Sequence, residues 1–155
     1  MGLIEVKEYL KKYNKEKDII LVEESSATVE EAAHALNIEP GMIAKSLTFK
    51  VNDDIIMIVT KGTAKIDNSK YKHTFNAKAK MLTKEEVNEF INQEVGGVCP
   101  FALNPNIKVY LDVSLKDYEY VYPACGENHS AIKLSISELE ELSHFTSWID
   151  VCKIF

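Results

Sequence analysis

The 155-residue sequence has few cysteines, glycines and prolines, and it lacks a long apolar run. No stretch approaches the roughly 20 consecutive apolar residues that a membrane-spanning helix needs, so we expect no membrane partner. The charged N-terminal segment also lacks the apolar centre of a secretory signal peptide. Three cysteines without a Cys-x-x-Cys pair argue against a structural zinc site and fit a reducing compartment. The sequence therefore predicts a cytoplasmic protein that holds no metal.

Glycine motifs for nucleotide cofactors are also missing. The sequence contains neither a phosphate-binding P-loop signature nor the glycine fingerprint of dinucleotide-binding folds, so no cofactor is expected. A net charge of −6 is the wrong sign for a nucleic-acid binder as a whole, and we expect no DNA partner.

The lysines are nevertheless concentrated in one segment. Between positions 61 and 84 only one acidic residue, Asp67, accompanies seven lysines. The seven are Lys61, Lys65, Lys70, Lys72, Lys78, Lys80 and Lys84. Such a stretch can bind the phosphates of a nucleic acid even on an acidic protein. The alternative is a lysine-rich surface that contacts only water.

Helix signals recur along the chain as capping boxes, in which Ser or Thr precedes Glu by three residues. Two of these pairs are Thr28 with Glu31 and Thr83 with Glu86, and the second helix is expected to stop at Gly96-Gly97. A third pair, Ser137 with Glu140, predicts the last helix. Further helices are expected at about 3–13, as an N-terminal appendage, and around 64–73.

Strand patterns occupy the remaining segments. They cover 18–24, 43–51, 55–60, 107–113, 118–124, 130–136 and a closing strand from 148. The turn at 52–54 makes the second and third of these an antiparallel hairpin. With 46% hydrophobic and 27% charged residues, the chain suits one domain over 1–155. Hairpins mixed with helices favour the α+β class over a regular βαβ array.

One lysine is out of place in the strand IAKSLTFKV (43–51). Alternate side chains of a strand point to opposite faces, and Lys45 shares its face with Ile43, Leu47, Phe49 and Val51. A lysine is almost never fully buried without a partner. Lys45 therefore either has a structural ion-pair partner or lines a site where its charge is used.

The loop VGGVCPF (95–101) follows directly after a predicted helix. Its two glycines permit unusual backbone angles, so that several N–H groups can point at one oxygen. An ordinary glycine cap with a turn is the alternative. Cys99 in this loop, with His129 and Asp112, suggests a cysteine nucleophile only weakly, because these residues are far apart in sequence. The simpler interpretation of Cys99 is a small residue packed inside a tight loop.

Four segments occur in an order and spacing that resemble the YbaK family. They are TVEEAAHALNIEPGMIAKSLTF, EVGGVCPF, YLDVSL and ACGENHSAIKLSISEL, and the resemblance runs from about Val22 to the C-terminus. The family contains editing domains related to the insertion domain of bacterial prolyl-tRNA synthetase. It implies a single domain with a mixed, mostly antiparallel, barrel-like sheet surrounded by helices.

The resemblance also implies a set of site residues. Lys45 matches the family's key lysine, which engages the tRNA terminus near the scissile ester. The glycine-rich loop corresponds to Gly96, Gly97, Val98, Cys99 and Pro100, whose backbone would hold the aminoacyl carbonyl. Thr28 would line the amino-acid pocket, where some members have an aromatic residue. Other positions that recur in the family are Asp112, Gly126 and His129.

The resemblance finally implies a function in translation fidelity. The chain is expected to be a trans-editing hydrolase that removes a small amino acid, of the Ala, Ser, Thr or Cys class, from a mischarged tRNA. A positioned water would attack the ester, and Lys61, Lys65, Lys70, Lys72, Lys78 and Lys80 would bind tRNA phosphates. The partners would be the tRNA acceptor end and a synthetase. The alternatives are a non-catalytic tRNA-binding or regulatory relative and a Cys99-dependent hydrolase of a small ester.

Overall fold

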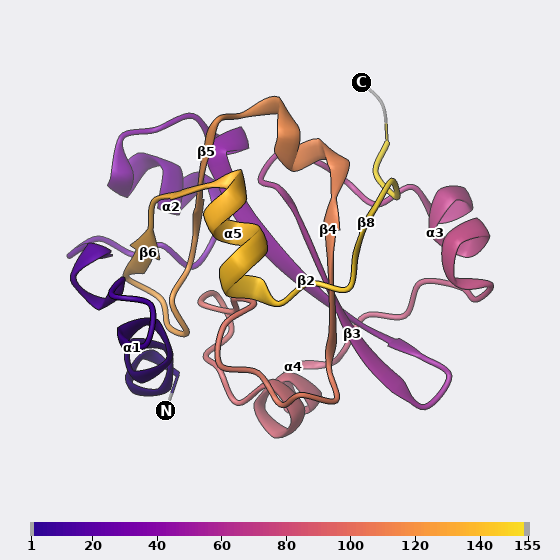
Figure 1. Ribbon diagram of the computed structural model, residues 1–155. Coiled ribbons are helices and arrows are strands. Elements are labelled where there is room, and N and C mark those ends of the chain that lie inside the picture. The colour runs from indigo at the N-terminus through magenta and orange to yellow at the C-terminus, as the bar shows by residue number, and fades with distance from the viewer. Residues whose placement is uncertain (1, 154–155) are drawn as a thin grey trace.

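Helices and strands are interleaved along the chain in this computed structural model, which describes residues 2–153 (Figure 1). The helical elements are α1 (Leu3–Lys11), η1 (Glu16–Asp18), α2 (Val29–Leu36), η2 (Pro40–Met42), α3 (Asn68–Phe75), α4 (Lys84–Glu86), η3 (Val87–Ile91), η4 (Val113–Asp117) and α5 (Ile136–Ser143). The strands are β1 (Ile19–Leu21), β2 (Ile43–Val51), β3 (Asp54–Lys61), β4 (Lys108–Asp112), β5 (Tyr120–Pro123), β6 (Ser130–Ile132), β7 (Leu134–Ser135) and β8 (Ser147–Ile149).

The main sheet is mixed and is built around the β2–β3 hairpin. Its strand order is β7-β5-β2-β3-β4-β8, and a separate small sheet pairs β1 with β6. The β2–β3, β5–β7 and β1–β6 pairs are antiparallel, whereas β2–β5, β3–β4 and β4–β8 are parallel. The long hairpin makes antiparallel pairing the larger share. The expected α+β class with a mixed, curled sheet and surrounding helices is confirmed.

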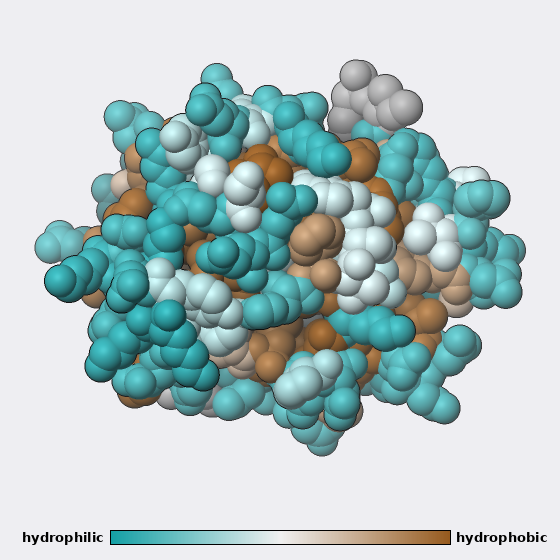
Figure 2. All heavy atoms as spheres, in the orientation of Figure 1, coloured by the Kyte–Doolittle hydropathy of each residue, from teal (hydrophilic) through white to brown (hydrophobic). Residues whose placement is uncertain are grey.

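Two apolar cores lie on opposite faces of the hairpin. The larger core includes Met57 and Val59 of β3, and α5 covers it with Leu139 and Leu142. The smaller core holds Phe49 of β2 and Ile58 of β3 under Tyr71 of α3. In Figure 1, α5 lies in front of the sheet and α3 lies at the opposite end from α1 and α2. The same view of the surface is mostly hydrophilic, with apolar residues between the charged ones near its centre (Figure 2).

The N-terminal helix belongs to the larger core and is not an appendage. Val6 and Leu10 of α1 are fully buried there, since they occupy one helical face at a spacing of four residues. Near its C-terminal end, α1 is also hydrogen-bonded to α5, since the Tyr9 hydroxyl donates to the carbonyl of Leu142 at 2.5 Å. Removing α1 would therefore open the core of the domain.

Several boundaries differ from the sequence-based expectation; the helix expected around 64–73, for example, is α3 at Asn68–Phe75. The last capping box is Ser135 with Glu138, two residues earlier than predicted. The expected strand 130–136 is interrupted at Lys133. Its first part, β6, pairs with β1 in the small sheet, and its second part, β7, pairs with β5 in the main sheet. The helix that begins at Thr83 ends in a π-type turn at Ile91 and is capped by Asn92, so Gly96 and Gly97 belong to a loop. The other two capping boxes are confirmed.

No helix among residues 2–153 is long and apolar enough to cross a membrane.

Candidate functional site

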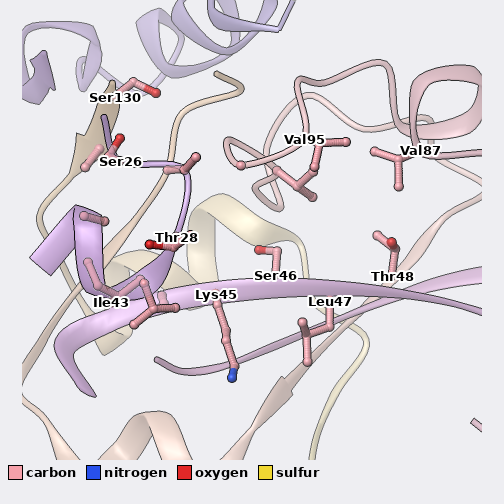
Figure 3. A pocket seen from close by; sticks show the side chains of 18 of the residues that line it. Ser26, Thr28, Ile43, Lys45, Ser46, Leu47, Thr48, Val87, Val95 and Ser130 are labelled. Carbon is pink, nitrogen blue, oxygen red and sulfur yellow. The ribbon is translucent and has the colours of Figure 1, made fainter. Parts of the chain in front are cut away.

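A cavity of about 410 Å³ lies against the middle of β2. Its other walls come from the segment before α2, from 81–87, from the loop 95–98 and from 122–131. The side chains of Ser46 and Thr48 point from β2 to the side on which Thr28, Val87 and Val95 lie (Figure 3). Hydroxyl groups thus face largely apolar walls, which is the usual composition of a small-molecule site.

Lys45 lines the same cavity, but its amine points to the other side of β2 from Ser46 (Figure 3). The Nζ donates a hydrogen bond to the main-chain carbonyl of Ala64. Within residues 2–153 no carboxylate forms an ion pair with it. Burial lowers the pKa of Lys45 from its ordinary value and the like charge of Lys65 adds to this effect, whereas the nearby Cys152 and Glu30 oppose it. The amine is thus a partly desolvated cation that forms no ion pair in the described chain.

The loop that follows η3 is held by the side-chain amide of Gln93. This residue is 2% exposed, and its Oε1 accepts from the Cys99 N–H at 2.8 Å. Its Nε2 donates to the carbonyl of Phe101 at 2.9 Å. One buried side chain therefore fixes both ends of the 99–101 segment, and sequence analysis gave it no role.

The main chain of the same loop is further fixed by Gly126. The Gly97 N–H donates to the Glu94 carbonyl at 2.8 Å, and the Gly126 N–H donates to the Gly97 carbonyl at 2.8 Å. A Cβ at Gly97 would lie 2.1 Å from the backbone of Glu127, so only glycine fits there. Gly126 has φ of 96°, which also favours glycine. Gly126 therefore supports the loop and does not line the cavity.

Within the loop residues 96–100, two amide groups have no acceptor among the described residues. They belong to Gly96 and Val98, and both residues line the cavity. Gly97 and Cys99 use their N–H groups inside the loop, and Pro100 has none. Of the five loop residues predicted as one unit, Gly96 and Val98 are thus placed to meet a ligand. Gly97, Cys99 and Pro100 lie behind them.

The structure does not assemble a cysteine nucleophile. Cys99 is fully buried, and burial raises the pKa of its thiol to about 12. His129 lies outside the cavity lining, where its Nδ1 is 2.9 Å from the carbonyl oxygen of Glu24. A thiol with so high a pKa carries almost no thiolate at neutral pH, and the thiolate is the nucleophile. The packing interpretation of Cys99 is the one that the geometry supports.

Asp112 is a structural carboxylate. It is fully buried at the end of β4, where its Oδ2 accepts from the Ser114 N–H at 2.9 Å. Its Oδ1 accepts from the Val151 N–H at 2.8 Å and so fixes the C-terminal segment. Asp112 was predicted as a binding residue, but it does not line the cavity.

Two of the six predicted phosphate-binding lysines are paired within the protein. Lys61 forms an ion pair with Asp117 at 2.7 Å, and Lys70 forms one with Asp150 at 3.0 Å. The other four are exposed, namely Lys65, Lys72, Lys78 and Lys80. Lys84, which belongs to the same lysine-rich stretch, lines the cavity. The exposed lysines of the stretch therefore lie on α3 and on the segments before and after it, and Lys84 lies at the cavity.

Ser46 and Thr48 were missed by sequence analysis. The period-two alternation that placed Lys45 on one face of the strand also places these two residues together on the other. The Ser46 Oγ is buried and has no hydrogen-bond partner among residues 2–153. A buried hydroxyl without a partner is uncommon, so Ser46 is a stronger ligand-binding candidate than its small size suggested. Residues 2–153 contain no group of three or more His, Cys, Asp or Glu side chains that could hold a metal ion.

Comparison with known proteins gives a consistent family. The family model of the aminoacyl-tRNA editing domain matches residues 23–142. The uncharacterized protein YwhH of Bacillus subtilis is 49% identical over 154 residues, which cover 99% of this chain and 98% of that protein. A proline–tRNA ligase of Bacillus pumilus is 31% identical over 107 residues, covering 61% of this chain but 19% of the ligase.

A solved structure is similar over nearly the whole chain. It is a crystal structure of a candidate trans-editing enzyme for prolyl-tRNA synthetase, with a TM-score of 0.87 and 26% sequence identity. The similarity covers 99% of this chain and 98% of that one. Together with the match over 23–142, this confirms the resemblance that the four sequence segments indicated. The chain belongs to the aminoacyl-tRNA editing domain family.

Proposed function

We propose that this protein is a trans-editing hydrolase that deacylates a tRNA carrying a small amino acid of the Ala, Ser, Thr or Cys class. The single observation that carries the proposal is Lys45, a partly buried lysine without a carboxylate partner at the edge of a cavity. An anionic ligand would stabilise this cation strongly, because the ligand would form the charged hydrogen bond that no carboxylate of the described chain provides. The phosphate next to a tRNA 3′ end is such an anion.

The two faces of β2 suggest how the substrate lies. On one side, the amine of Lys45 donates to the carbonyl of Ala64, the residue next to Lys65. On the other side, Ser46 faces the cavity. We infer that the phosphates of the acceptor end lie over the lysine side and that the aminoacyl ester enters the cavity. The strand edge would then separate the recognition of phosphate from the recognition of the amino acid.

The chemistry asked of the cavity is hydrolysis of an activated ester. The unpartnered amides of Gly96 and Val98 are suited to hold the carbonyl oxygen, where negative charge develops when water attacks. A positioned water, assisted by the ribose hydroxyl of the substrate, suffices for an ester that is already reactive. Lys45 and Lys84 would hold phosphate oxygens during this step. We place this activity in the cytoplasm, alongside a synthetase that produces the mischarged tRNA.

The size of the cavity favours a small amino acid. Its volume of about 410 Å³ is near the lower end of the usual range for small-molecule sites, about 300–1,000 Å³. Part of that space must hold the terminal ribose. Walls such as Val87 and Val95 would exclude a large side chain by contact, whereas a smaller one can always enter.

A deacylation panel tests the proposed function directly. The full-length protein is incubated with tRNAs charged with alanine, serine, threonine, cysteine, leucine and phenylalanine, and each rate is compared with spontaneous hydrolysis. We expect acceleration for one or more of the first four and none for the last two. Tight binding without acceleration of any ester would instead support the non-catalytic tRNA-binding relative.

Replacing Cys99 by alanine should leave deacylation within about threefold of wild type, a change of about 0.7 kcal/mol in the barrier. The reason is that the thiol is buried and protonated, while the backbone of the neighbouring residues faces the cavity. Single-turnover hydrolysis is measured with and without a thiol-alkylating reagent. Rapid inactivation of wild type by the reagent, together with loss of turnover in Cys99→Ala, would restore the cysteine-dependent alternative.

Reversing the charges of Lys65, Lys72 and Lys78 to glutamate should weaken tRNA binding and flatten its salt dependence. Each phosphate contact contributes about 0.7–0.9 to the slope of log affinity against log salt, so the slope should fall by about 2–3. Binding is measured by titration at several salt concentrations. The matched control reverses Lys11, Lys12 and Lys17, which are also exposed and change the net charge equally. If the two triple variants change tRNA affinity and its salt dependence equally, the lysine-rich stretch is only a solvated surface.

A further inference from the structure

The outer edge of β2 is open between two paired stretches. At its start, Ile43 and Ala44 pair with β5. Toward its end, the Lys50 N–H donates to the Lys80 carbonyl at 2.9 Å, and the Leu82 N–H donates to the Thr48 carbonyl at 3.1 Å. Between these stretches no described strand continues the sheet on this side.

The hydrogen-bond alternation identifies the groups on that open edge. In a strand, the N–H and C=O of one residue point to the same side, and those of the next residue point to the other side. Lys50 and Thr48 bond outward, away from β3, so the N–H and C=O of Ser46 point outward too. Neither group has a partner among residues 2–153. Ser46 thus offers one donor and one acceptor at the wall of the cavity.

Unpaired main-chain groups of this kind are rare away from bulk water, because leaving them unpaired is costly. The ligand that matches them must carry a donor and an acceptor at the spacing of one strand residue. An α-amino acid ester has this arrangement, since its ammonium and its carbonyl flank a single Cα. Opposed residues in an antiparallel sheet exchange the same two hydrogen bonds.

We propose that Ser46 recognises the aminoacyl group by main-chain pairing, with its C=O accepting from the α-ammonium and its N–H donating to the ester carbonyl. This inference rests on the proposed function. It adds that the main chain of Ser46 binds the α-ammonium and the carbonyl of the ester. The ester oxygen keeps a second lone pair for one of the amides of Gly96 and Val98, and the oxyanion that forms when water attacks has a third for the other amide. Because the pairing is independent of the side chain, it selects α-amino acid esters as a class.

The pairing also fixes where the substrate side chain lies. Directly opposed residues of an antiparallel pair place their side chains on the same face, with Cβ atoms about 4.5–5.5 Å apart. The side chain of Ser46 points into the cavity, so that of the substrate would point there as well. It would then lie beside the buried, unpartnered Ser46 Oγ, between the walls that limit its size.

Deaminated substrates test the contact to the α-ammonium. For each small aminoacyl-tRNA that is hydrolysed, the same tRNA is charged with the acid that lacks the amino group. These acids are propionate for alanine, 3-hydroxypropionate for serine, 3-mercaptopropionate for cysteine and 3-hydroxybutyrate for threonine. Each enzymatic rate is divided by the spontaneous rate, because the ammonium also activates the free ester. We expect the acceleration to fall about 10- to 100-fold without the amino group, as for the loss of a charged hydrogen bond.

Two variants test the contact from the Ser46 N–H. Ser46→Pro removes that N–H, and the stretch of β2 around Ser46 tolerates proline because its outer side is unpaired and the N–H does not bond to β3. Ser46→Ala removes the hydroxyl and keeps the main-chain groups. We expect Ser46→Pro to lower the acceleration of amino and deaminated esters alike by about 10-fold or more relative to Ser46→Ala. The ratio between the two esters should persist, since the C=O remains.

The outcomes separate this inference from the proposed function. Equal acceleration of amino and deaminated esters by the wild-type protein would overturn main-chain pairing and leave the deacylase proposal standing. Equal rates for well-folded Ser46→Pro and Ser46→Ala would overturn the N–H contact. If Ser46→Pro is unfolded at the assay temperature, the comparison of amino and deaminated esters with the wild-type protein alone tests main-chain pairing. If no aminoacyl-tRNA is hydrolysed above the spontaneous rate, both proposals are wrong.

Discussion

Lys45→Ala is expected to lower single-turnover deacylation about 100-fold or more while leaving the fold intact. The loss in rate follows from the removal of the desolvated charge that holds the phosphate next to the reacting ester, because a misplacement of about 1 Å at the reacting group can cost about 10²-fold in rate. The assay uses enzyme in excess over a tRNA charged with a small amino acid. A thermal melt of the same preparations reports stability.

The stability of Lys45→Ala separates a ligand-binding lysine from a structural one. A lysine in a buried ion pair would leave a stranded carboxylate when removed, at a cost of roughly 3–5 kcal/mol. Lys45 has no such partner within residues 2–153, and its amine bonds to the carbonyl of Ala64. Truncating the side chain removes a hydrogen bond to that carbonyl and also removes a partly desolvated ammonium, two effects of opposite sign, so the free energy of unfolding should change by at most about 1 kcal/mol.

Two further variants at this position isolate the charge. Lys45→Met keeps most of the apolar stem and removes the ammonium, so it should be as inactive as Lys45→Ala. Lys45→Arg keeps the charge but spreads it over a planar group, and it should recover part of the rate. Normal turnover with a much lower melting temperature in Lys45→Ala would make the residue structural and remove the main support for the proposed hydrolase.

The sequence predicted those parts of the fold that depend on local patterns. Two capping boxes and the hairpin of β2 and β3 are local, and the structure has them where they were expected. The last helix shows the limit, because both Ser135 and Ser137 stand three residues before a glutamate. The pattern cannot choose between them. The pairing of Leu134 and Ser135 with β5 does, because the strand ends where the helix begins.

The site was predictable where one residue was out of place and not where several must converge. Lys45 is conspicuous because its charge interrupts an apolar face. Asp112 and Gly126 attracted attention by resemblance, but their hydrogen bonds show that they fix segments of the chain. The role proposed for Ser46 depends on an unpaired stretch of β2, and this gap exists only once β5 and the 80–82 segment are in place. That information is tertiary and leaves no local pattern.

Gln93→Met is expected to destabilise the protein and to slow deacylation. Methionine matches the shape of glutamine but leaves two buried groups without partners, the Cys99 N–H and the Phe101 carbonyl. Each unsatisfied group costs about 1–3 kcal/mol, so the total for the two groups should be about 2–6 kcal/mol. For a chain of this length, each kcal/mol lowers the melting temperature by about 2–4 °C. Melting curves of wild type and variant measure this loss.

The kinetic part of the prediction tests whether Gln93 positions the loop for catalysis. At a temperature where the variant is fully folded, kcat should fall about 10-fold or more, because the Gly96 and Val98 amides are no longer held in place. KM should change little, since the phosphate contacts lie elsewhere. An unchanged kcat beside the lower melting temperature would make Gln93 a purely structural residue.

Gln93→Glu provides the matched control, because it differs from the natural residue by one donor group. Its carboxyl can still accept from the Cys99 N–H, but an ionised carboxylate cannot donate to the Phe101 carbonyl. Burial raises the pKa of a carboxyl at such a position above its unfolded value. The stability that it contributes is therefore fully present below the unfolded pKa, about 4.3, and is lost as pH rises through the higher folded pKa. Acidification should then restore stability relative to wild type in Gln93→Glu and not in Gln93→Met. The two-ended hydrogen bond from residue 93 to the loop is wrong as an explanation if both variants respond to pH alike.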